Sequence, residues 1–138
     1  MPAEETNNQF DDLVAAALAA RSKAYAPYSR FGVGAALKCQ SGQVFVGVNI
    51  ENRSLGLTIC AERVAVVAAV AAGERHFLAI AVAADSDQPI VPCGACRQFL
   101  AEFAPDLVIV SSNIRGDRKI EDLSHLLPDP SRGILKAC

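Results

Sequence analysis

An excess of positive charge is missing from this sequence. Its 138 residues include 13 lysines and arginines against 15 aspartates and glutamates, giving a formal net charge of −2 and an isoelectric point near 5.6. Proteins that bind nucleic-acid phosphates or anionic lipid rely on a basic surface, which this balance does not provide. Nucleic acid and membrane are therefore not expected as partners, and a small neutral or weakly polar ligand fits the charge better.

Long apolar runs are missing too. The most apolar stretches, residues 64–72 and 77–84, fall short of the roughly 18 to 20 residues that a membrane-spanning helix needs. Both are typical of core segments. Residues 1–8 are acidic and rich in amides, without the basic start and apolar run of a secretory signal. We therefore expect a cytoplasmic protein.

The cysteine content does not suit a disulfide framework. Five cysteines are an odd number, and cytoplasmic thiols are kept reduced. A metal site or a catalytic thiol is the more natural use. Three cysteines fall in two short motifs, whereas Cys39 and Cys138 stand alone. We expect Cys39 to be a small buried hydrophobic residue in a strand, and Cys138 to be a loose terminal residue.

The chain length predicts a single domain over residues 1–138, with one core and no internal repeat. Helical periodicity alternates with short strand-like apolar runs. The pattern predicts helices at about residues 9–23, 60–72 and 93–103, strands at 33–39, 43–49, 77–84 and 107–112, and a further short helix within 120–127. This alternation is typical of an α/β fold, a three-layer α-β-α sandwich. Its mixed central sheet is expected to be antiparallel at the first hairpin and parallel where helices cross over.

Two short motifs carry the chemistry, and each opens a predicted helix. They are Cys60-Ala61-Glu62-Arg63 and Pro92-Cys93-Gly94-Ala95-Cys96-Arg97-Gln98. Cysteines three residues apart face the same side of a helix, so Cys93 and Cys96 can direct both sulfurs at one ion, and first-turn N–H groups favour thiolate. Cys60 holds the equivalent place on its own helix. Three protein ligands leave a tetrahedral zinc ion one open position, as in catalytic zinc sites.

A site of three thiolates needs positive charge nearby. With Zn²⁺ it keeps one net negative charge, which weakens the metal as a Lewis acid. The two helix N-termini offset part of this charge, and Arg63 is placed to donate hydrogen bonds to the ligand sulfurs. Glu62 follows Cys60 by two residues, a spacing that does not share one face of a regular helix. We therefore expect Cys60 at the cap of its helix.

The cysteine motif alone allows other interpretations. A lone Cys-x-x-Cys is also typical of a redox pair or of half a structural zinc site. A redox pair explains neither Cys60 nor Glu62, and a closed four-ligand site needs a distant partner, because His76 and His125 lie outside ligand spacing. We expect both histidines to be ordinary surface or capping residues. Beside a zinc ligand at a helix start, Glu62 is a credible general base.

The motifs resemble those of the zinc-dependent deaminases, which combine a His-or-Cys, x, Glu element with Pro-Cys-x-x-Cys. Nearly the whole chain is similar to the small cytidine deaminases of nucleoside salvage, in their three-cysteine form. Supporting segments are Ala24-Tyr25-Ala26-Pro27-Tyr28-Ser29, Phe31-Gly32-Val33-Gly34-Ala35-Ala36, Asn49-Ile50-Glu51-Asn52 and Gly56-Leu57-Thr58-Ile59. The resemblance implies that family's fold, and hydrolytic deamination of cytidine and deoxycytidine to uridine and deoxyuridine with release of ammonia.

The same resemblance implies how the chemistry is divided. Cys60, Cys93 and Cys96 would bind one zinc ion per subunit. Glu62 would take a proton from water and deliver protons to N3 of the cytosine ring and to the departing amine.

The resemblance also implies substrate contacts and an assembly. Asn49 and Glu51 would hold the ribose hydroxyl, the backbone near Ala61 would hold the ring carbonyl, and Phe31 would pack near the ring. Relatives with this length and this site are homotetramers whose sites are built across subunit contacts. We expect the same assembly here.

Three positions depart from the usual pattern of that family. Gly32 stands where proline is usual, Leu55 where an aromatic residue is usual, and residues 129–131 where a phenylalanine is usual. In the relatives this phenylalanine stacks on the pyrimidine from a neighbouring subunit, and here no aromatic residue follows Leu127. The first alternative is therefore a deaminase of the same fold that acts on another aminated heterocycle or nucleoside analogue. A noncatalytic zinc-binding module is the second alternative, and the acidic balance disfavours nucleic-acid editing.

Overall fold

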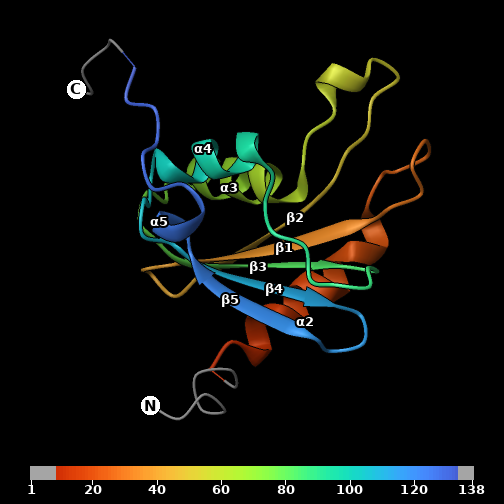
Figure 1. Cartoon of the computed structure of the whole chain (residues 1–138), viewed down its shortest axis with the longest axis horizontal. Helices are drawn as coiled ribbons and strands as arrows, with labels where there is room; N and C mark the ends of the chain where they lie inside the picture. Colours follow the sequence, from red (N-terminus) through yellow and green to blue (C-terminus); the bar gives the residue numbers. More distant parts are fainter. Residues whose placement is uncertain (1–8, 134–138) are drawn as a thin grey trace.

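The computed structural model describes residues 9–133 as a mixed five-stranded sheet with helices on both faces (Figure 1). The strands are β1 (Val33–Cys39), β2 (Val44–Val48), β3 (Phe77–Ala84), β4 (Val108–Asn113) and β5 (Arg118–Asp122). The α-helices are α2 (Asp11–Ala20), α3 (Ala61–Ala71), α4 (Gly94–Ala101) and α5 (Leu123–Leu126), and the short 3-10 helices are η1 (Arg21–Lys23) and η2 (Leu55–Leu57). Within this described part of the chain, no helix has the length and apolarity needed to cross a membrane.

The sheet has the strand order β2-β1-β3-β4-β5. Strand β1 pairs antiparallel with both β2 and β3, and β5 pairs antiparallel with β4. Strands β3 and β4 are parallel, and α4 forms the crossover between them. The structure therefore confirms the predicted mixed sheet, antiparallel at the hairpin and parallel at the helical crossover.

Helix α2 covers one face of the sheet (Figure 1). Its apolar stripe of Leu13, Val14 and Ala17 is buried in a cluster with Ala36 of β1 and Ala81 of β3. Alanine on the sheet side leaves room for the helix to lie close to the strands. Burial of this stripe is what holds α2 in place, because apolar surface removed from water stabilises the packed state.

Helices α3 and α4 cover the opposite face, so the predicted three layers are present (Figure 1). Ala65 and Val66 of α3 and Leu100 of α4 are fully buried in one cluster with Leu37 and Ile80 of the sheet. These two helices carry the two cysteine motifs at their N-terminal ends. One core cluster therefore fixes the relative positions of both motifs.

Helix α3 begins and ends where the sequence predicts. Cys60 is its N-cap, with an extended backbone at φ −71° and ψ 153°. Gly73 follows the helix at φ 97°, a left-handed conformation that favours glycine. The N–H groups of Gly73 and Glu74 donate to the carbonyls of Val70 and Ala69, each at 3.0 Å, and thereby satisfy the last turn.

Two glycines let the helices touch the backbone of the sheet. A Cβ atom on Gly34 of β1 would lie 2.0 Å from the carbonyl oxygen of Ala17 in α2. A Cβ atom on Gly47 of β2 would lie 2.2 Å from the carbonyl oxygen of Ala61 and 2.4 Å from the backbone nitrogen of Ala65 in α3. Neither position accepts a side chain while the helix stays where it is.

The structure confirms a short helix within residues 120–127 and adds a strand before it that was not predicted. The segment predicted as a short helix within residues 120–127 begins as the edge strand β5, and only Leu123–Leu126 is helical. Strand β5 contains a single apolar residue, Ile120, and pairs with β4 on one side only. Because an edge strand needs little apolar surface, its sequence carries a weak strand signal.

We predict that Gly47→Ala lowers the free energy of unfolding by about 2–4 kcal/mol, because the added methyl group meets the backbone of α3 and overpacks the contact. Chemical denaturation monitored by circular dichroism measures the change. Gly56→Ala is the matched control, since a Cβ atom there has no neighbour within 4 Å. Equal stability of the two variants would contradict the close approach.

Candidate active site

The three cysteines of the two motifs meet at the N-terminal ends of α3 and α4. Cys60 caps α3, Cys93 caps α4, and Cys96 lies in the first turn of α4. Their sulfur atoms all lie within 4.8 Å of one another, and the Sγ atoms of Cys93 and Cys96 are 3.6 Å apart. The structure thus brings together all three residues that were predicted as metal ligands.

The cap position of Cys60 explains how Cys60 and Glu62, only two residues apart, can face the same site. As predicted, the extended backbone of Cys60 lies outside regular helix geometry, whereas Glu62 lies in the first turn of α3. Two residues that are two positions apart within a regular helix point to different sides of it, but this does not hold when the first of them is the cap residue, outside the helix. Both side chains therefore serve one site.

The thiol groups influence one another strongly. The pKa of Cys60 is lowered to about 5, first by a hydrogen bond from Cys96 and further by Arg63, whose Nη2 lies 3.6 Å from the Cys60 sulfur. The pKa of Cys96 is raised, first because its thiol donates to Cys60 and then because it is buried. The hydrogen bond between the two thiols therefore favours the thiolate at Cys60 and the protonated thiol at Cys96.

This donor set fits a zinc ion. Thiolate is a ligand that zinc favours, and a divalent cation would allow the neighbouring sulfurs to ionise together. Cys96 is buried and Cys60 is partly buried, whereas Cys93 is exposed. The cluster is thus closed toward the core and open on one side, as a site with a free coordination position requires.

Glu62 is the buried carboxylate of this site. Its side chain is only 5% exposed, within the first turn of α3. Burial raises its pKa above the ordinary value, and the negative charge of Cys60 raises it further. A carboxyl group with a raised pKa both accepts and releases a proton more readily near neutral pH, as a general acid and base must.

The predicted substrate contacts lie in one hydrogen-bonded assembly next to Cys60. Ile50 and Ile59 exchange two backbone hydrogen bonds of 2.9 Å, which places the segment around Asn49 and Glu51 beside the residue that precedes Cys60. Tyr25 lies along the other side of the same segment. The segment that carries the two predicted ribose contacts is therefore hydrogen-bonded to the peptide that leads into the metal site.

Asn49 organises the loop that leads into β1. Its side chain accepts a hydrogen bond from the N–H of Val33 and donates one to the carbonyl of Phe31, both at 2.8 Å. The side chain is nearly buried, yet an amide offers two donors and two acceptor positions. One donor and one acceptor position therefore remain beyond these contacts, and Phe31 is held at a defined place, 38% exposed.

Glu51 is held by a turn that the sequence interpretation missed. Its carboxylate accepts hydrogen bonds from the N–H groups of Tyr28 and Ser29, at 2.9 and 3.1 Å, and from the Ser29 hydroxyl at 2.5 Å. The Ser29 hydroxyl lowers the pKa of Glu51 and so favours the ionised carboxylate. The Pro27-Tyr28-Ser29 turn signal was visible in the sequence, but its partner lies 22 residues away.

The remaining predicted residues also have defined places. Ala61 is the first residue of α3, so its N–H is one of the first-turn donors without a partner inside the helix. Cys39 is buried in β1, as predicted, and Cys138 lies outside the described residues. His76 and His125 are both exposed, in agreement with the prediction of surface residues.

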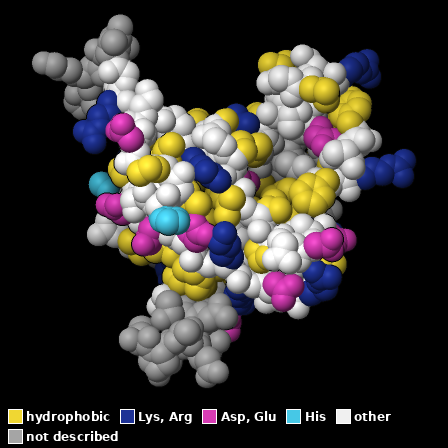
Figure 2. Space-filling model, viewed as in Figure 1, with side chains coloured by type: hydrophobic (Ala, Val, Ile, Leu, Met, Phe, Trp, Pro, Cys, Tyr) yellow, Lys and Arg dark blue, Asp and Glu magenta, His cyan; other side chains and the backbone are white. Residues whose placement is uncertain are grey.

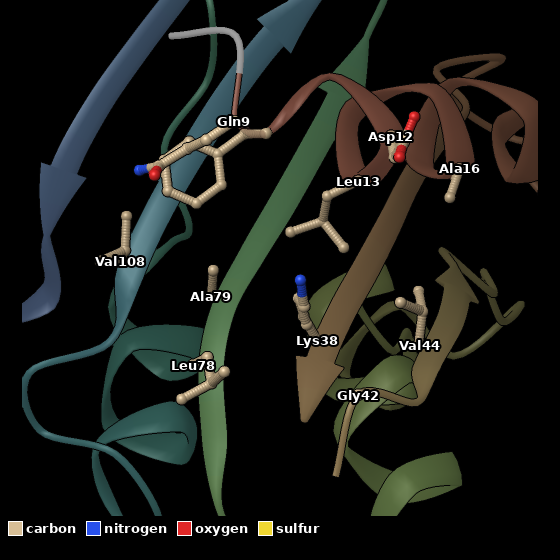
Figure 3. A pocket seen from close by; sticks show the side chains of 11 residues that line it. Gln9, Asp12, Leu13, Ala16, Lys38, Gly42, Val44, Leu78, Ala79 and Val108 are labelled. Atoms are coloured by element: carbon tan, nitrogen blue, oxygen red, sulfur yellow. The ribbon is translucent and has the colours of Figure 1, made fainter. Parts of the chain in front are cut away.

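A surface pocket of about 590 Å³ lies on the other face of the sheet, beneath the start of α2 (Figure 3). Its wall includes Phe10, Leu13, Lys38 and Leu78. None of the predicted site residues lines it. The cysteine cluster and this pocket are therefore separate features, on opposite faces of the sheet.

A cluster of three thiols that fits a zinc ion, with a buried carboxylate in the same first turn, indicates that the chain is a zinc-dependent hydrolase. A family model described as the cytidine and deoxycytidylate deaminase zinc-binding region matches residues 7–112. The chain belongs to the cytidine and deoxycytidylate deaminase family.

Relatives and solved structures agree with this membership. The chain is 51% identical over 117 residues to a cytidine deaminase of Halalkalibacterium halodurans, covering 84% of this chain and 89% of the relative. It is 45% identical over 119 residues to a cytidine deaminase of Sporosarcina psychrophila, covering 86% and 88%. A crystal structure of cytidine deaminase from Burkholderia pseudomallei superposes with a TM-score of 0.85 at 52% identity, covering 87% of this chain and 97% of that chain.

We predict that Cys60→Ala abolishes stoichiometric zinc binding, because two thiols remain where three converge. Zinc content per chain after dialysis, measured by atomic absorption, checks this. Cys39→Ala is the control, because it removes a buried thiol that lies outside the cluster. Retention of a full equivalent of zinc by Cys60→Ala would show that Cys60 is not a ligand.

Proposed function

We propose that this chain deaminates cytidine and deoxycytidine to uridine and deoxyuridine with release of ammonia. The observation that carries the proposal is the buried Glu62 in the first turn of α3, beside the three cysteines. Family membership supports the same reaction, since curated relatives at 45–51% identity carry the name cytidine deaminase. A purely structural zinc site has no use for a desolvated carboxylate, which speaks against a noncatalytic module.

In this proposal Cys60, Cys93 and Cys96 hold the zinc ion, which when bound supplies the Lewis acidity that makes hydroxide available at neutral pH. Glu62 accepts a proton from water and delivers it to N3 of the ring as the oxygen of the water bonds to C4. It then takes the remaining proton from that oxygen and delivers it to the amino group at C4. The C4–N bond breaks, ammonia leaves, and the oxygen of the water becomes the C4 carbonyl. Burial of Glu62 keeps these protons from exchanging with bulk water.

The same proposal assigns the nucleoside contacts. Asn49 and Glu51 bind the ribose hydroxyl, which is supported by the acceptor and donor capacity that their internal hydrogen bonds leave free. The N–H of Ala61 binds the ring carbonyl, and Phe31 packs near the ring. Cys96, and after it Arg63 through its contact with the sulfur, lower the pKa of Cys60 and so favour its thiolate.

We predict that Glu62→Gln lowers kcat for cytidine by about 10²–10⁴-fold, because the amide cannot transfer protons, while zinc content per chain stays unchanged. Loss of ultraviolet absorbance and release of ammonia from cytidine measure kcat. Glu74→Gln is the matched control, because it changes a carboxylate that follows α3 at the opposite end of the helix from Glu62. Unchanged turnover by Glu62→Gln would disprove the proton-transfer assignment.

A second candidate is a deaminase of another aminated heterocycle. It is favoured by one observation, that no aromatic residue follows Leu127. The same assay distinguishes the candidates when cytidine, deoxycytidine and cytosine-bearing analogues are compared with the wild-type enzyme. Turnover of an analogue without turnover of either plain nucleoside would replace the first candidate by the second.

We also propose a homotetramer in the cytoplasm. Apolar side chains gather on the projecting arm around η2 (Figure 2), where Leu55 is 73% exposed and Leu57 is 65% exposed. Such a patch is typical of a surface covered by another subunit. The four cysteines in the described part of the chain are all free thiols, which suits a reducing compartment.

We predict that the wild-type protein has the mass of four 14.5 kDa chains in solution at micromolar concentration. We expect Leu57→Asp to reduce this mass, because assembly would bury the new carboxylate in the subunit contact at η2. Light scattering coupled to size-exclusion chromatography measures it. Leu78→Asp, which lies at the pocket beneath α2, is the control and keeps the mass of the wild type. A fully active wild-type monomer would rule out the assembly.

A further inference from the structure

Arg97 follows the metal-ligand candidate Cys96 and connects three parts of the chain. Its Nε donates to the carbonyl of Pro92 at 2.8 Å, and its Nη1 donates to the carbonyl of Leu126 at 3.2 Å. Its backbone N–H donates to the carbonyl of Cys93 at 2.9 Å. The Arg97 side chain therefore ties the loop that enters α4 to the last carbonyl of α5, and its backbone N–H makes the first helical bond of α4, to the cap residue Cys93.

These bonds fix the peptide that carries Cys93. Pro92 is buried, and Cys93 comes directly after a stretch without regular structure that leads from β3 to α4. Cys93 is also the exposed member of the cluster, so core packing orients it less than it orients Cys96. The side-chain bond to the Pro92 carbonyl and the backbone bond to the Cys93 carbonyl restrain the chain on either side of the Cys93 Cα atom, and so set the direction in which the Cys93 side chain leaves the backbone.

Helix α5, whose Leu126 carbonyl accepts a hydrogen bond from Arg97, is held in place by the core. Leu123 of α5 is fully buried, and its N–H donates to the carbonyl of Leu107 at 2.8 Å. The N–H of Leu127 donates to the carbonyl of Leu123 at 2.7 Å, which closes the turn that presents the Leu126 carbonyl. Arg97 thus ties a loop without regular structure to a point that the core holds in place.

We propose that Arg97 is a positioning residue of the metal site, which holds Cys93 in the orientation needed to bind the ion together with Cys60 and Cys96. The inference rests on the proposed role of these cysteines as zinc ligands. Arg97 and Arg63 contact different groups: Arg63 contacts a ligand sulfur directly, whereas Arg97 donates hydrogen bonds to backbone carbonyls. Its effect is expected on metal affinity rather than on proton transfer.

Lysine cannot replace arginine here. The Nε and Nη1 donors of a rigid, planar guanidinium reach two separate carbonyls, whereas a lysine keeps the charge but offers a single ammonium on a flexible chain. Arg97→Lys therefore removes the geometry without removing the charge. Gln98→Ala is the matched control, because the Gln98 side chain bonds to the backbone of Ser131, at 2.9 and 3.0 Å, rather than to the loop before Cys93.

The test measures the zinc dissociation constant of the full chain by competition with a colorimetric chelator at fixed pH. We expect Arg97→Lys to weaken zinc binding about 10- to 100-fold, the effect typical of losing a group that orients a metal ligand. Gln98→Ala is expected to bind zinc as the wild type does. Equal affinity of Arg97→Lys and wild type, or an equal loss in Gln98→Ala, would overturn the proposal.

A second readout separates positioning from general stability. Cobalt substituted for zinc shows sulfur-to-cobalt charge-transfer absorption, whose intensity per ion should fall in Arg97→Lys as the Cys93 thiolate is lost, and should stay at the wild-type level in Gln98→Ala. Unchanged absorption in Arg97→Lys would overturn the proposal. Circular dichroism of the metal-free variants checks folding, and Arg97→Gln is measured in the same way if the lysine variant does not fold. A wild-type chain without stoichiometric zinc would instead refute the proposed metal role of the cysteines themselves.

Discussion

The contact between α3 and the backbone of β2 at Gly47 is the constraint on which the site depends. At this point the first and fifth residues of α3, Ala61 and Ala65, lie against a strand position that has no side chain. The helix can neither slide along the strand nor tilt without meeting backbone atoms. Because Cys60 and Glu62 flank Ala61, the packing at Gly47 fixes where both chemical groups stand.

The second half of the site depends on a different kind of restraint. Helix α4 shares the core cluster with α3 through Leu100, and this sets the distance between the two helix ends. Its cap residue, Cys93, is exposed and follows a loop, so hydrogen bonds rather than apolar packing must hold it. The site thus combines one motif fixed by close backbone packing with another in which the core holds Cys96 and Leu100 while hydrogen bonds hold the backbone around the exposed Cys93.

The ionisable groups of the site lie close enough to repel one another when they are charged, and this repulsion favours binding of a cation. Three sulfurs and a carboxylate are crowded at two helix N-termini, with Arg63 as the nearby cation. The hydrogen bond to Cys60 and burial raise the pKa of Cys96, and burial and the charge of Cys60 raise the pKa of Glu62. The same crowding favours a divalent cation, so the folded chain holds a centre that is complete only when the cation is bound.

Much of this architecture could be predicted from the sequence because its signals are local. The helix start at Cys60, the end of the same helix near residue 72 and the apolar run of β3 each depend on neighbouring residues, and all three predictions agree with the structure. The spacing of Cys60 and Glu62 even required the cap position that is found. Family resemblance supplied the reaction and the substrate contacts.

What could not be predicted depends on partners far apart in the chain. Strand β5 is held by pairing with β4, and its own residues alternate too weakly to indicate a strand. Ser29 bonds to a carboxylate 22 residues away, and Arg97 bonds to a carbonyl 29 residues away. Arginine and serine occur throughout protein surfaces, so nothing in their neighbours indicates which of them holds a distant backbone group.

At the two close contacts the three layers of the protein lie unusually near one another. Gly34 and Gly47 lie on adjacent paired strands, and each allows a helix to reach the sheet from its own face. The backbone amides of β1 and β2 around Gly34 and Gly47 are therefore shielded from both faces of the sheet. Their hydrogens exchange with solvent only when the molecule unfolds as a whole. Within a single subunit the segment around η2 has no such cover, so in an isolated chain its amides exchange through local opening before the layers beside it separate.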